Sequence, residues 1–233
     1  MTLSKASIYV LVDNEANEGF ISEWGLSLYV ETNEWKALFD SGGSASVIRY
    51  NAEELGLDLK SIDFGFLSHH HGDHYGGFKY VGSIKPSLNI YTPPGDVSYL
   101  IEWGLKPIVV DKPLTISSSV WSTGPLRLRL WGIREHSMVI YVKGKGLVIL
   151  VGCSHPGLKT IIDKALEVTG INDIYLIIGG FHSPPLNEID YIAGKARFIA
   201  PLHCSGALVK EYLAMKYPDK YVALRAGDKL NIR

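Results

Sequence analysis

The sequence LSHHHGDHYGG, residues 67–77, places four histidines and one aspartate within six consecutive positions. The apolar run FGFLS, residues 64–68, leads into it and is typical of a β-strand, whereas the glycines that follow permit a tight loop. A tag-like histidine run is excluded because such tags lie at chain termini and lack the aspartate and the glycines. We therefore expect this stretch to bind a metal ion rather than to form a solvated polar loop.

The spacing of these side chains indicates which of them reach the same ion. Alternate residues of an extended segment face the same way, so His69 and His71 are expected to act together while His70 points away. A glycine then lets the chain bend, which directs Asp73 and His74 toward a neighbouring position. Neutral imidazoles and a carboxylate suit zinc, iron or manganese, so the type of ligand leaves the metal open.

Three more histidines each close an apolar strand. They lie in VILVGCSHPG (His155), YLIIGGFHSP (His182) and FIAPLHCSG (His203). One such histidine is usually a satisfied polar residue, but three in the same setting form a pattern. Of the eight histidines, only His70 and His136 fall outside this pattern and the pattern of the first stretch.

Short runs rich in valine, isoleucine, tyrosine and phenylalanine dominate the chain and predict a protein with more strands than helices. Strands are expected at 7–12, 26–32, 36–40, 64–68, 88–92, 107–110, 126–131, 138–142, 146–152, 174–180, 197–203 and 221–228. Helices are expected within 155–170 and 206–218, where apolar residues recur at three- and four-residue spacing. No linker or repeat is visible, so we expect one α/β (α+β) domain over 1–233, with two sheets face to face and helices outside.

Composition excludes several classes of protein. The chain of 233 residues is 46% hydrophobic and carries a formal net charge of −1, which gives no electrostatic footprint for nucleic acid. No apolar run approaches the ~20 residues that cross a bilayer, and the N-terminus lacks the features of a signal peptide. We therefore expect a cytoplasmic protein that binds neither nucleic acid nor a membrane. The absence of glutamine and the rarity of methionine are typical of heat-adapted proteins.

The two cysteines, Cys153 and Cys204, are expected to be free thiols, since disulfides are rare in the cytosol. Each stands beside a candidate ligand, in GCSH and in LHCSG. A free cysteine is commonly a small buried core residue, and we favour that interpretation for both.

The segment HHHGDH matches the H-x-H-x-D-H signature of the metallo-β-lactamase superfamily, and ALFDSG, residues 37–42, resembles the aspartate motif that precedes it. The resemblance implies an αββα sandwich of two mixed sheets with a dinuclear metal site at its edge, holding two divalent ions, zinc first and manganese, iron or magnesium as alternatives. It implies these roles: His69, His71 and His155 hold the first ion; Asp73, His74 and His203 hold the second; Asp73 also orients the attacking group; Asp40 lies behind the ligands and orients them.

One departure from the family pattern concerns the bridging ligand. The family places a bridging aspartate at the end of the strand before the last histidine, where this chain has Gly179 and Gly180. Three alternatives follow: hydroxide alone joins the ions, His182 supplies a replacement ligand, or the second ion is weakly held. The imidazole of His182 suits both a ligand and a substrate contact.

The segments GCSHPG, GGFH and HCSG resemble one branch of the superfamily, the proteins related to dihydropterin–ribofuranosylaminobenzene phosphate synthase. In that branch the implied reaction joins a hydroxymethyl-dihydropterin diphosphate to an aryl amine and releases pyrophosphate. The stretch EWGLSLYVE, residues 23–31, also resembles the branch, with Trp24 where a histidine is expected.

Other functions weigh differently. Flavodiiron oxygen reductases have a carboxylate where His71 stands, and RNA-processing members carry a large insertion and basic surfaces. A general hydrolase of thioesters or lactones stays open, as does a non-catalytic module that binds or senses a ligand through metal. The complete ligand set argues against the last, because a structural zinc site needs only four closed ligands.

Overall fold

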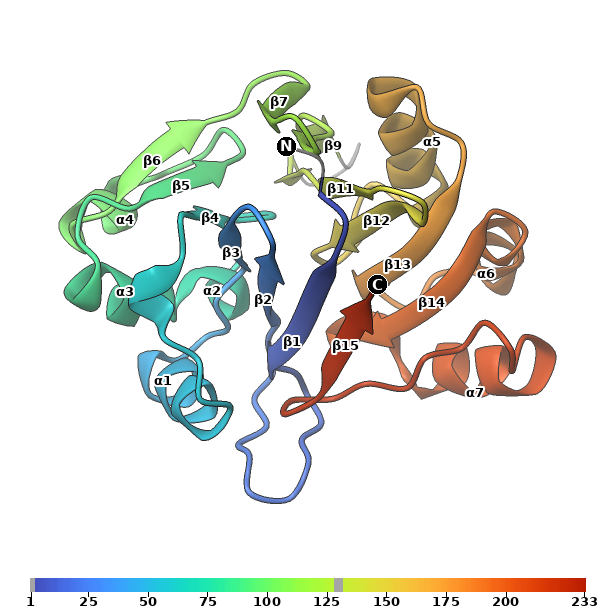
Figure 1. Ribbon diagram of the computed structural model, residues 1–233, viewed down its shortest axis with the longest axis horizontal. Coiled ribbons are helices and arrows are strands. Elements are labelled where there is room, and N and C mark those ends of the chain that lie inside the picture. The colour runs from blue at the N-terminus through green and yellow to red at the C-terminus, as the bar shows by residue number, and fades with distance from the viewer. Residues whose placement is uncertain (1–2, 128–131) are drawn as a thin grey trace.

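Two β-sheets pack face to face with helices on both outer sides (Figure 1). The computed structural model describes residues 3–127 and 132–233. One sheet has seven strands and the other has six, and a two-stranded ribbon lies apart from both. The predicted αββα sandwich of two mixed sheets is confirmed.

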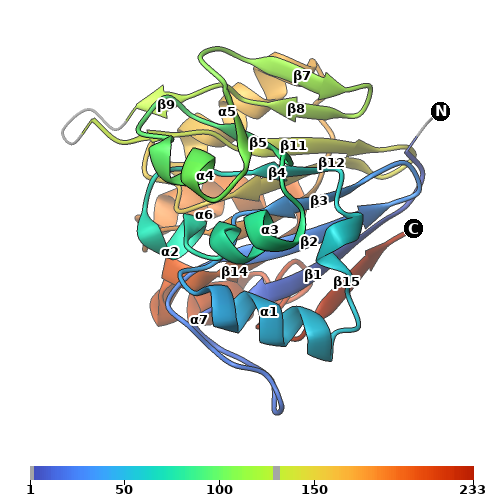
Figure 2. The same ribbon diagram turned by 90° about the vertical axis from the view of Figure 1, so that its left-hand side faces the viewer.

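The first sheet is antiparallel at one side and parallel at the other. Its strands, in spatial order, are β15 (Lys229–Ile232), β1 (Ala6–Val12), β2 (Ser27–Thr32), β3 (Lys36–Phe39), β4 (Phe64–Phe66), β5 (Asn89–Thr92) and β6 (Lys106–Val109). Its outer face is covered by α1 (Ala45–Glu54), α3 (Phe78–Ile84) and α4 (Ser98–Glu102), which face the viewer in Figure 2. The short helix α2 (Gly72–Tyr75) follows β4, and a 3-10 turn spans Leu59–Ser61.

The second sheet has a parallel half, and the ends of its strands lie beside the loop that follows β4 in the first sheet. Its strands, in spatial order, are β14 (Ala196–Leu202), β13 (Ile174–Gly180), β12 (Gly146–Val151), β11 (Met138–Val142), β8 (Val120–Ser122) and β7 (Leu114–Ser117). Helices α5 (Leu158–Thr169), α6 (Leu186–Ala193) and α7 (Ala207–Lys216) cover it, β9 (Leu126–Arg127) and β10 (Arg134–Glu135) form the ribbon, and a 3-10 turn spans His203–Ser205. Because β12, β13 and β14 are parallel, the residues after them meet at one edge.

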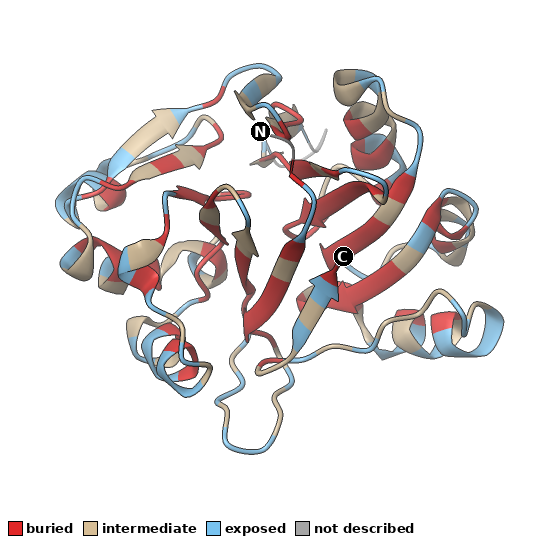
Figure 3. Ribbon diagram, viewed as in Figure 1, coloured by how far each residue is buried: buried red, intermediate tan, exposed pale blue. Residues whose placement is uncertain are grey.

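The central strands are apolar on both faces because each face packs against a different layer (Figure 3). In β1, Ile8 and Val10 face the core between the sheets, whereas Leu11 faces the helices of the first sheet. In β12, Leu150 faces the central core and Ile149 faces the helices of the second sheet. Continuous apolar runs in the sequence therefore mark strands that are buried on both sides.

Several elements differ from the sequence prediction. The strand expected at 221–228 is wrong: these residues form a loop with isolated bridges at Tyr221 and Ala226. The left-handed Gly227 (φ 95°) turns the chain there, and the last strand is instead β15. The expected strand 126–131 is described only as far as β9, since 128–131 lie outside the described residues. None of the helices in the described ranges is long and apolar enough to cross a membrane.

Candidate metal centre

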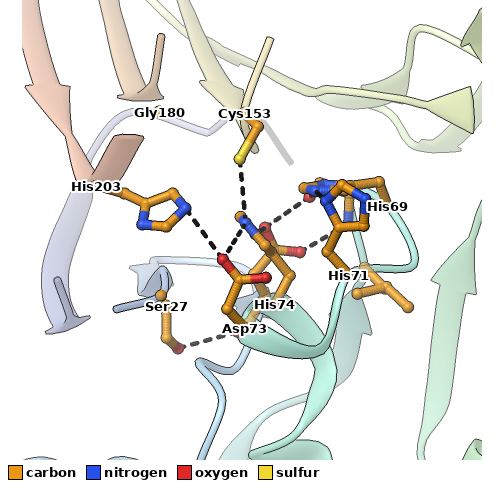
Figure 4. Close-up of polar contacts among 12 residues, drawn as sticks. Ser27, His69, His71, Asp73, His74, Cys153, Gly180 and His203 are labelled. Atoms are coloured by element: carbon orange, nitrogen blue, oxygen red, sulfur yellow. Dashed lines mark hydrogen bonds and ion pairs between the residues drawn. The ribbon is translucent and has the colours of Figure 1, made fainter. Parts of the chain in front are cut away.

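Three histidines from two sheets form the first half of the centre, and Figure 4 labels two of them, His69 and His71. His69 follows β4 and is fully buried, and its Nε2 lies 3.0 Å from Nδ1 of His71. The ring of His155, which follows β12, lies 4.7 Å from the His69 ring and 5.0 Å from the His71 ring. Tetrahedral zinc with Zn–N bonds of ~2.1 Å sets its ligand nitrogens about 3.4 Å apart, so the nitrogen pair already lies near that spacing.

The second half of the centre adjoins the first. Helix α2 carries Asp73 and His74, and Oδ2 of Asp73 lies 3.7 Å from Nε2 of His74. The same carboxylate oxygen lies 3.4 Å from Nε2 of His203, which follows β14. The His69 and His74 rings are 4.1 Å apart. The structure therefore brings all six predicted ligands to one edge of the sandwich.

Two histidines lie outside the centre. His70 turns away from it, with Nδ1 2.8 Å from the Tyr99 hydroxyl and Nε2 2.8 Å from the Pro93 carbonyl oxygen. His136 is buried just before β11, and its Nε2 lies 2.8 Å from the Leu67 carbonyl oxygen. The structure therefore shows the expected alternation of side chains, with His69 and His71 facing the centre and His70 facing away from it.

Four of the histidines are held from behind by a polar side chain. Their Nδ1 atoms contact these partners: His69 with Ser68 Oγ (2.9 Å), His74 with Asp40 Oδ2 (2.7 Å), His155 with Glu135 Oε2 (2.9 Å) and His203 with Asn14 Oδ1 (2.9 Å). Such contacts fix the tautomer and leave Nε2 to face the centre. Nε2 of His203 is buried and makes no hydrogen bond within the described part of the chain. A buried nitrogen without a hydrogen bond is what a metal ligand shows when the protein is considered alone, so the residues fit a bound ion.

Glu135 is a residue that sequence reasoning missed. Its buried carboxylate accepts the backbone N–H groups of Cys153 (3.0 Å), Ser154 (2.8 Å) and His155 (2.9 Å), besides its contact with the His155 ring. Burial alone would raise the pKa of Glu135, but its bonds with His155 and the backbone lower it. One carboxylate thus fixes the whole loop after β12. Its only signal in the sequence is a charged residue just before the apolar run of 138–142.

Asp40 is fully buried behind His74. It accepts hydrogen bonds from the Ser68 backbone N–H and hydroxyl, both at 2.7 Å, in addition to the His74 ring. Burial raises the pKa of Asp40. Burial alone would lower the pKa of His74, but Asp40 raises it. The contact with Asp40 is made by Nδ1 of His74, which leaves Nε2 to face the centre. The expected place of Asp40 behind the ligands agrees with this geometry.

The ionisation states of the other donors suit a cation. Burial holds the pKa of His69 well below its ordinary value and lowers that of His71. Burial alone would raise the pKa of Asp73, but its contacts with His203 and His74 lower it to about 2. The centre therefore presents neutral imidazoles at His69 and His71 and an ionised carboxylate at Asp73, the forms that bind metal.

Cys153 is free and buried, as expected, but it is not an ordinary core residue. Its Sγ lies 3.3 Å from Nε2 of His74. The donor atoms of His69, Cys153 and His155 all lie within 4.8 Å of one another, and so do those of His74, Cys153 and His203. The sulfur therefore stands between the two halves of the centre.

The strand end before the last ligand has no room for a side chain. A Cβ atom at Gly179 would lie 1.9 Å from the Val151 carbonyl oxygen, and one at Gly180 would lie 2.8 Å from Cys204 Sγ. His182, two residues on, is exposed, with its ring 4.8 Å from the His155 ring. Burial nevertheless lowers the pKa of His182, so this ring is also neutral at pH 7.

A cavity of about 490 Å³ opens beside His203. It is lined by Asn14, Glu15, Trp24, Ser183, His203, Cys204, Gly206, Ala207, Lys210 and Glu211. The indole of Trp24 is 65% exposed and its ring lies 5.0 Å from the His203 ring. An apolar flat surface and one candidate metal ligand, His203, thus meet in one cavity.

Comparison with known proteins gives consistent results. The sequence model of the metallo-beta-lactamase superfamily matches residues 25–155. A 7,8-dihydropterin-6-methyl-4-(beta-D-ribofuranosyl)-aminobenzene-5'-phosphate synthase of Methanocaldococcus jannaschii is 26% identical, over 94% of each chain. An uncharacterised protein of the same archaeon is 27% identical, over 85% of this chain and 90% of its own. Among solved structures, Tm1679, described as a metal-dependent hydrolase of the beta-lactamase superfamily, superposes with a TM-score of 0.80 at 25% identity, over 97% and 99% of the two chains.

Proposed function

Because the chain belongs to the metallo-β-lactamase superfamily, we propose that it is a metal-dependent enzyme that acts on a phosphorylated or diphosphate-bearing small molecule. The observation that carries the proposal is the convergence of two donor groups, the second of which reaches a cavity through His203. The buried Nε2 of His203 is left without a hydrogen bond among the described residues. A superfamily of metal-dependent enzymes and a metal-ready centre point the same way.

We assign the first ion to His69, His71 and His155 and the second to Asp73, His74 and His203. The imidazole-rich set favours zinc over magnesium, which prefers oxygen ligands and retains several waters. Manganese and iron accept the same ligand types and stay as alternatives. Two ions held by these ligands would neutralise charge on a leaving phosphate and would lower the pKa of a bound water to ~7.

The residues around the centre support a substrate with a flat ring and a phosphate. The exposed face of Trp24 is available to stack on a planar ring, and the exposed His182 lies where it would contact the phosphate end. Asp73, ionised and partly exposed, would accept a hydrogen bond from the attacking group and orient it. In a synthase reaction the amine nitrogen bonds to the methylene carbon, the carbon–oxygen bond breaks, pyrophosphate leaves with that electron pair, and the nitrogen gives up one proton to water.

One relative supports this substrate class. It is named as a pterin-related phosphate synthase, and it aligns with 94% of this chain. Hydrolysis is the second candidate, because Tm1679, the structure with a TM-score of 0.80, is described as a metal-dependent hydrolase. The two candidates use the same ligands and differ in whether an amine or a water attacks.

The test compares substrates on metal-loaded protein. We expect pyrophosphate release from a hydroxymethyl-dihydropterin diphosphate in the presence of a ribofuranosylaminobenzene phosphate, and a thermal shift on adding pyrophosphate, since a ligand of the folded state stabilises it. His69→Ala should lose the activity, whereas His70→Ala should retain it. Fast turnover of thioesters or lactones, with no response to any phosphorylated compound, would reject the phosphate class and leave the plain hydrolase.

A further inference from the structure

We propose that the sulfur of Cys153 is a metal ligand shared by both ions of the centre. The proposal rests on the metal-dependent function proposed above, but it concerns how the ions are joined and not which substrate they serve. It gives the centre the negatively charged shared ligand that Gly179 and Gly180 do not supply.

The distances place the sulfur in both halves of the centre. Its donor atom lies within 4.8 Å of those of His69 and His155, and within 4.8 Å of those of His74 and His203. With Zn–S and Zn–N bonds of ~2.3 and ~2.1 Å, tetrahedral zinc sets a sulfur and a nitrogen about 3.6 Å apart. The observed distance of 3.3 Å from Cys153 Sγ to His74 Nε2 is close to that value.

The surroundings of the sulfur are those of a ligand. A structural cysteine normally packs among apolar side chains, whereas the sulfur of Cys153 lies within 4.8 Å of a ring nitrogen of each of five histidines, which are His69, His74, His155, His182 and His203. The position is fixed, because Glu135 accepts the backbone N–H of Cys153 and holds the ring of His155 through the same carboxylate. The hydrogen bond with Cys204 and burial raise the pKa of the Cys153 thiol in the protein alone. A coordinating divalent ion removes such a proton outright.

Packing at the neighbouring strand end excludes a carboxylate there. A Cβ atom at Gly180 would lie 2.3 Å from the Gly152 carbonyl oxygen and 2.8 Å from Cys204 Sγ. Strands β12 and β13 therefore approach closely, and sulfur atoms occupy the space beside them. Cys204 differs from Cys153, because its sulfur contacts the Cys153 carbonyl oxygen at 3.9 Å and falls in neither histidine group that contains His69 or His74.

Cobalt substitution tests the assignment without any substrate. We expect the cobalt-loaded wild-type protein to show a thiolate-to-metal charge-transfer band in the near ultraviolet. Cys153→Ser should lose this band, and the matched control Cys204→Ser should retain it. A wild-type protein without the band, or a band that persists in Cys153→Ser and vanishes in Cys204→Ser, would overturn the proposal.

A second measurement uses only the wild-type protein, in case Cys153→Ser does not fold. Cadmium NMR of the fully loaded protein should show two signals, both shifted into the range of sulfur-ligated cadmium. One shifted signal would make Cys153 a ligand of a single ion and reject sharing, and none would reject ligation. Because neither measurement involves turnover, a failure of the phosphate substrate class leaves these outcomes unchanged, and the reverse also holds.

Discussion

At the scale of single residues, three ligands, His74, His155 and His203, depend on a second residue that is distant in the sequence. The order of histidines and the aspartate in 69–74 predicts which side chains face together, because alternation is a local property of extended chain. The partners behind them, such as Asn14 for His203 and Glu135 for His155, come from distant segments. No local pattern marks those two residues, so a single sequence could not identify them.

The first prediction compares adjacent histidines. His69→Ala removes a buried donor from the centre, so the variant should lose at least one ion after dialysis. His70→Ala should keep the wild-type metal content, because this ring bonds Tyr99 and Pro93 outside the centre. Elemental analysis of both purified variants checks the pair. Full metal retention in His69→Ala would refute the ligand assignment.

The second prediction concerns the carboxylate that sequence reasoning missed. Glu135→Gln keeps the size of the side chain but weakens its bonds with the His155 ring and with three backbone N–H groups. Loss of such a supporting partner typically lowers metal affinity about 10- to 100-fold. Competition with a coloured chelator measures the change. Glu31→Gln is the control, since Glu31 pairs with Lys36 on β2 and β3, and an equal loss there would contradict a specific role for Glu135.

At the scale of elements, the strands that are buried on both faces were predicted from their sequences, whereas the exposed edge strand β15 was not. Strands β1, β12 and β13 are apolar on both faces, so each appears in the sequence as a continuous apolar run. Such a run predicts a strand whichever residues face the central core. Strand β15 has the sequence Lys-Leu-Asn-Ile and lies at the edge of the sheet. It pairs with a strand on one side only, and it exposes Lys229 and Asn231. This strand forms by pairing with β1, which lies near the other end of the sequence. A local sequence pattern carries no information about such a distant partner.

The third prediction concerns the contact between α6 and α7. One carboxylate oxygen of Asp190 accepts hydrogen bonds from Lys216, Tyr212 and Tyr217, each at 2.8 Å. These bonds lower the pKa of Asp190 to about 2 from its ordinary 3.8, and the bond from Lys216 has the largest effect. A carboxyl group with a lowered pKa in the folded state stabilises the fold above its unfolded pKa and loses that effect as the pH falls through the folded value.

Asp190→Asn should therefore be less stable than wild type at pH 7, and the difference should disappear between pH ~4 and ~2. Urea unfolding at a series of pH values measures it as a difference between the two proteins, which cancels the titration of other groups. Glu211→Gln, on the facing helix α7, serves as the control and should show no such step. A difference that stays constant down to pH ~2 would show that Asp190 acts through shape and not through charge.

At the scale of the whole molecule, the centre joins the two sheets. His69, His71, Asp73 and His74 follow β4 of the first sheet, whereas His155 and His203 follow β12 and β14 of the second. The resemblance of the sequence to the superfamily predicted the sandwich, and the sandwich explains why segments more than 80 residues apart, such as those of His69 and His155, meet at one edge. The shape of the cavity depends on the loop of Asn14 and Trp24 and on the start of α7, so it was beyond prediction from local patterns.

The last prediction follows from ligands that span both sheets. Ions held there bind the folded chain and lose their site when the sheets separate, so they stabilise the fold by mass action, by ~4 kcal/mol for a free ion at a thousandfold excess over its Kd. Removing metal with a chelator should lower the urea midpoint without changing the slope of the transition, because the surface exposed on unfolding stays the same. His69→Ala should respond less to the chelator than wild type, and His70→Ala should respond equally. Equal midpoints for wild type with and without chelator would mean that the centre does not hold the sheets together through metal.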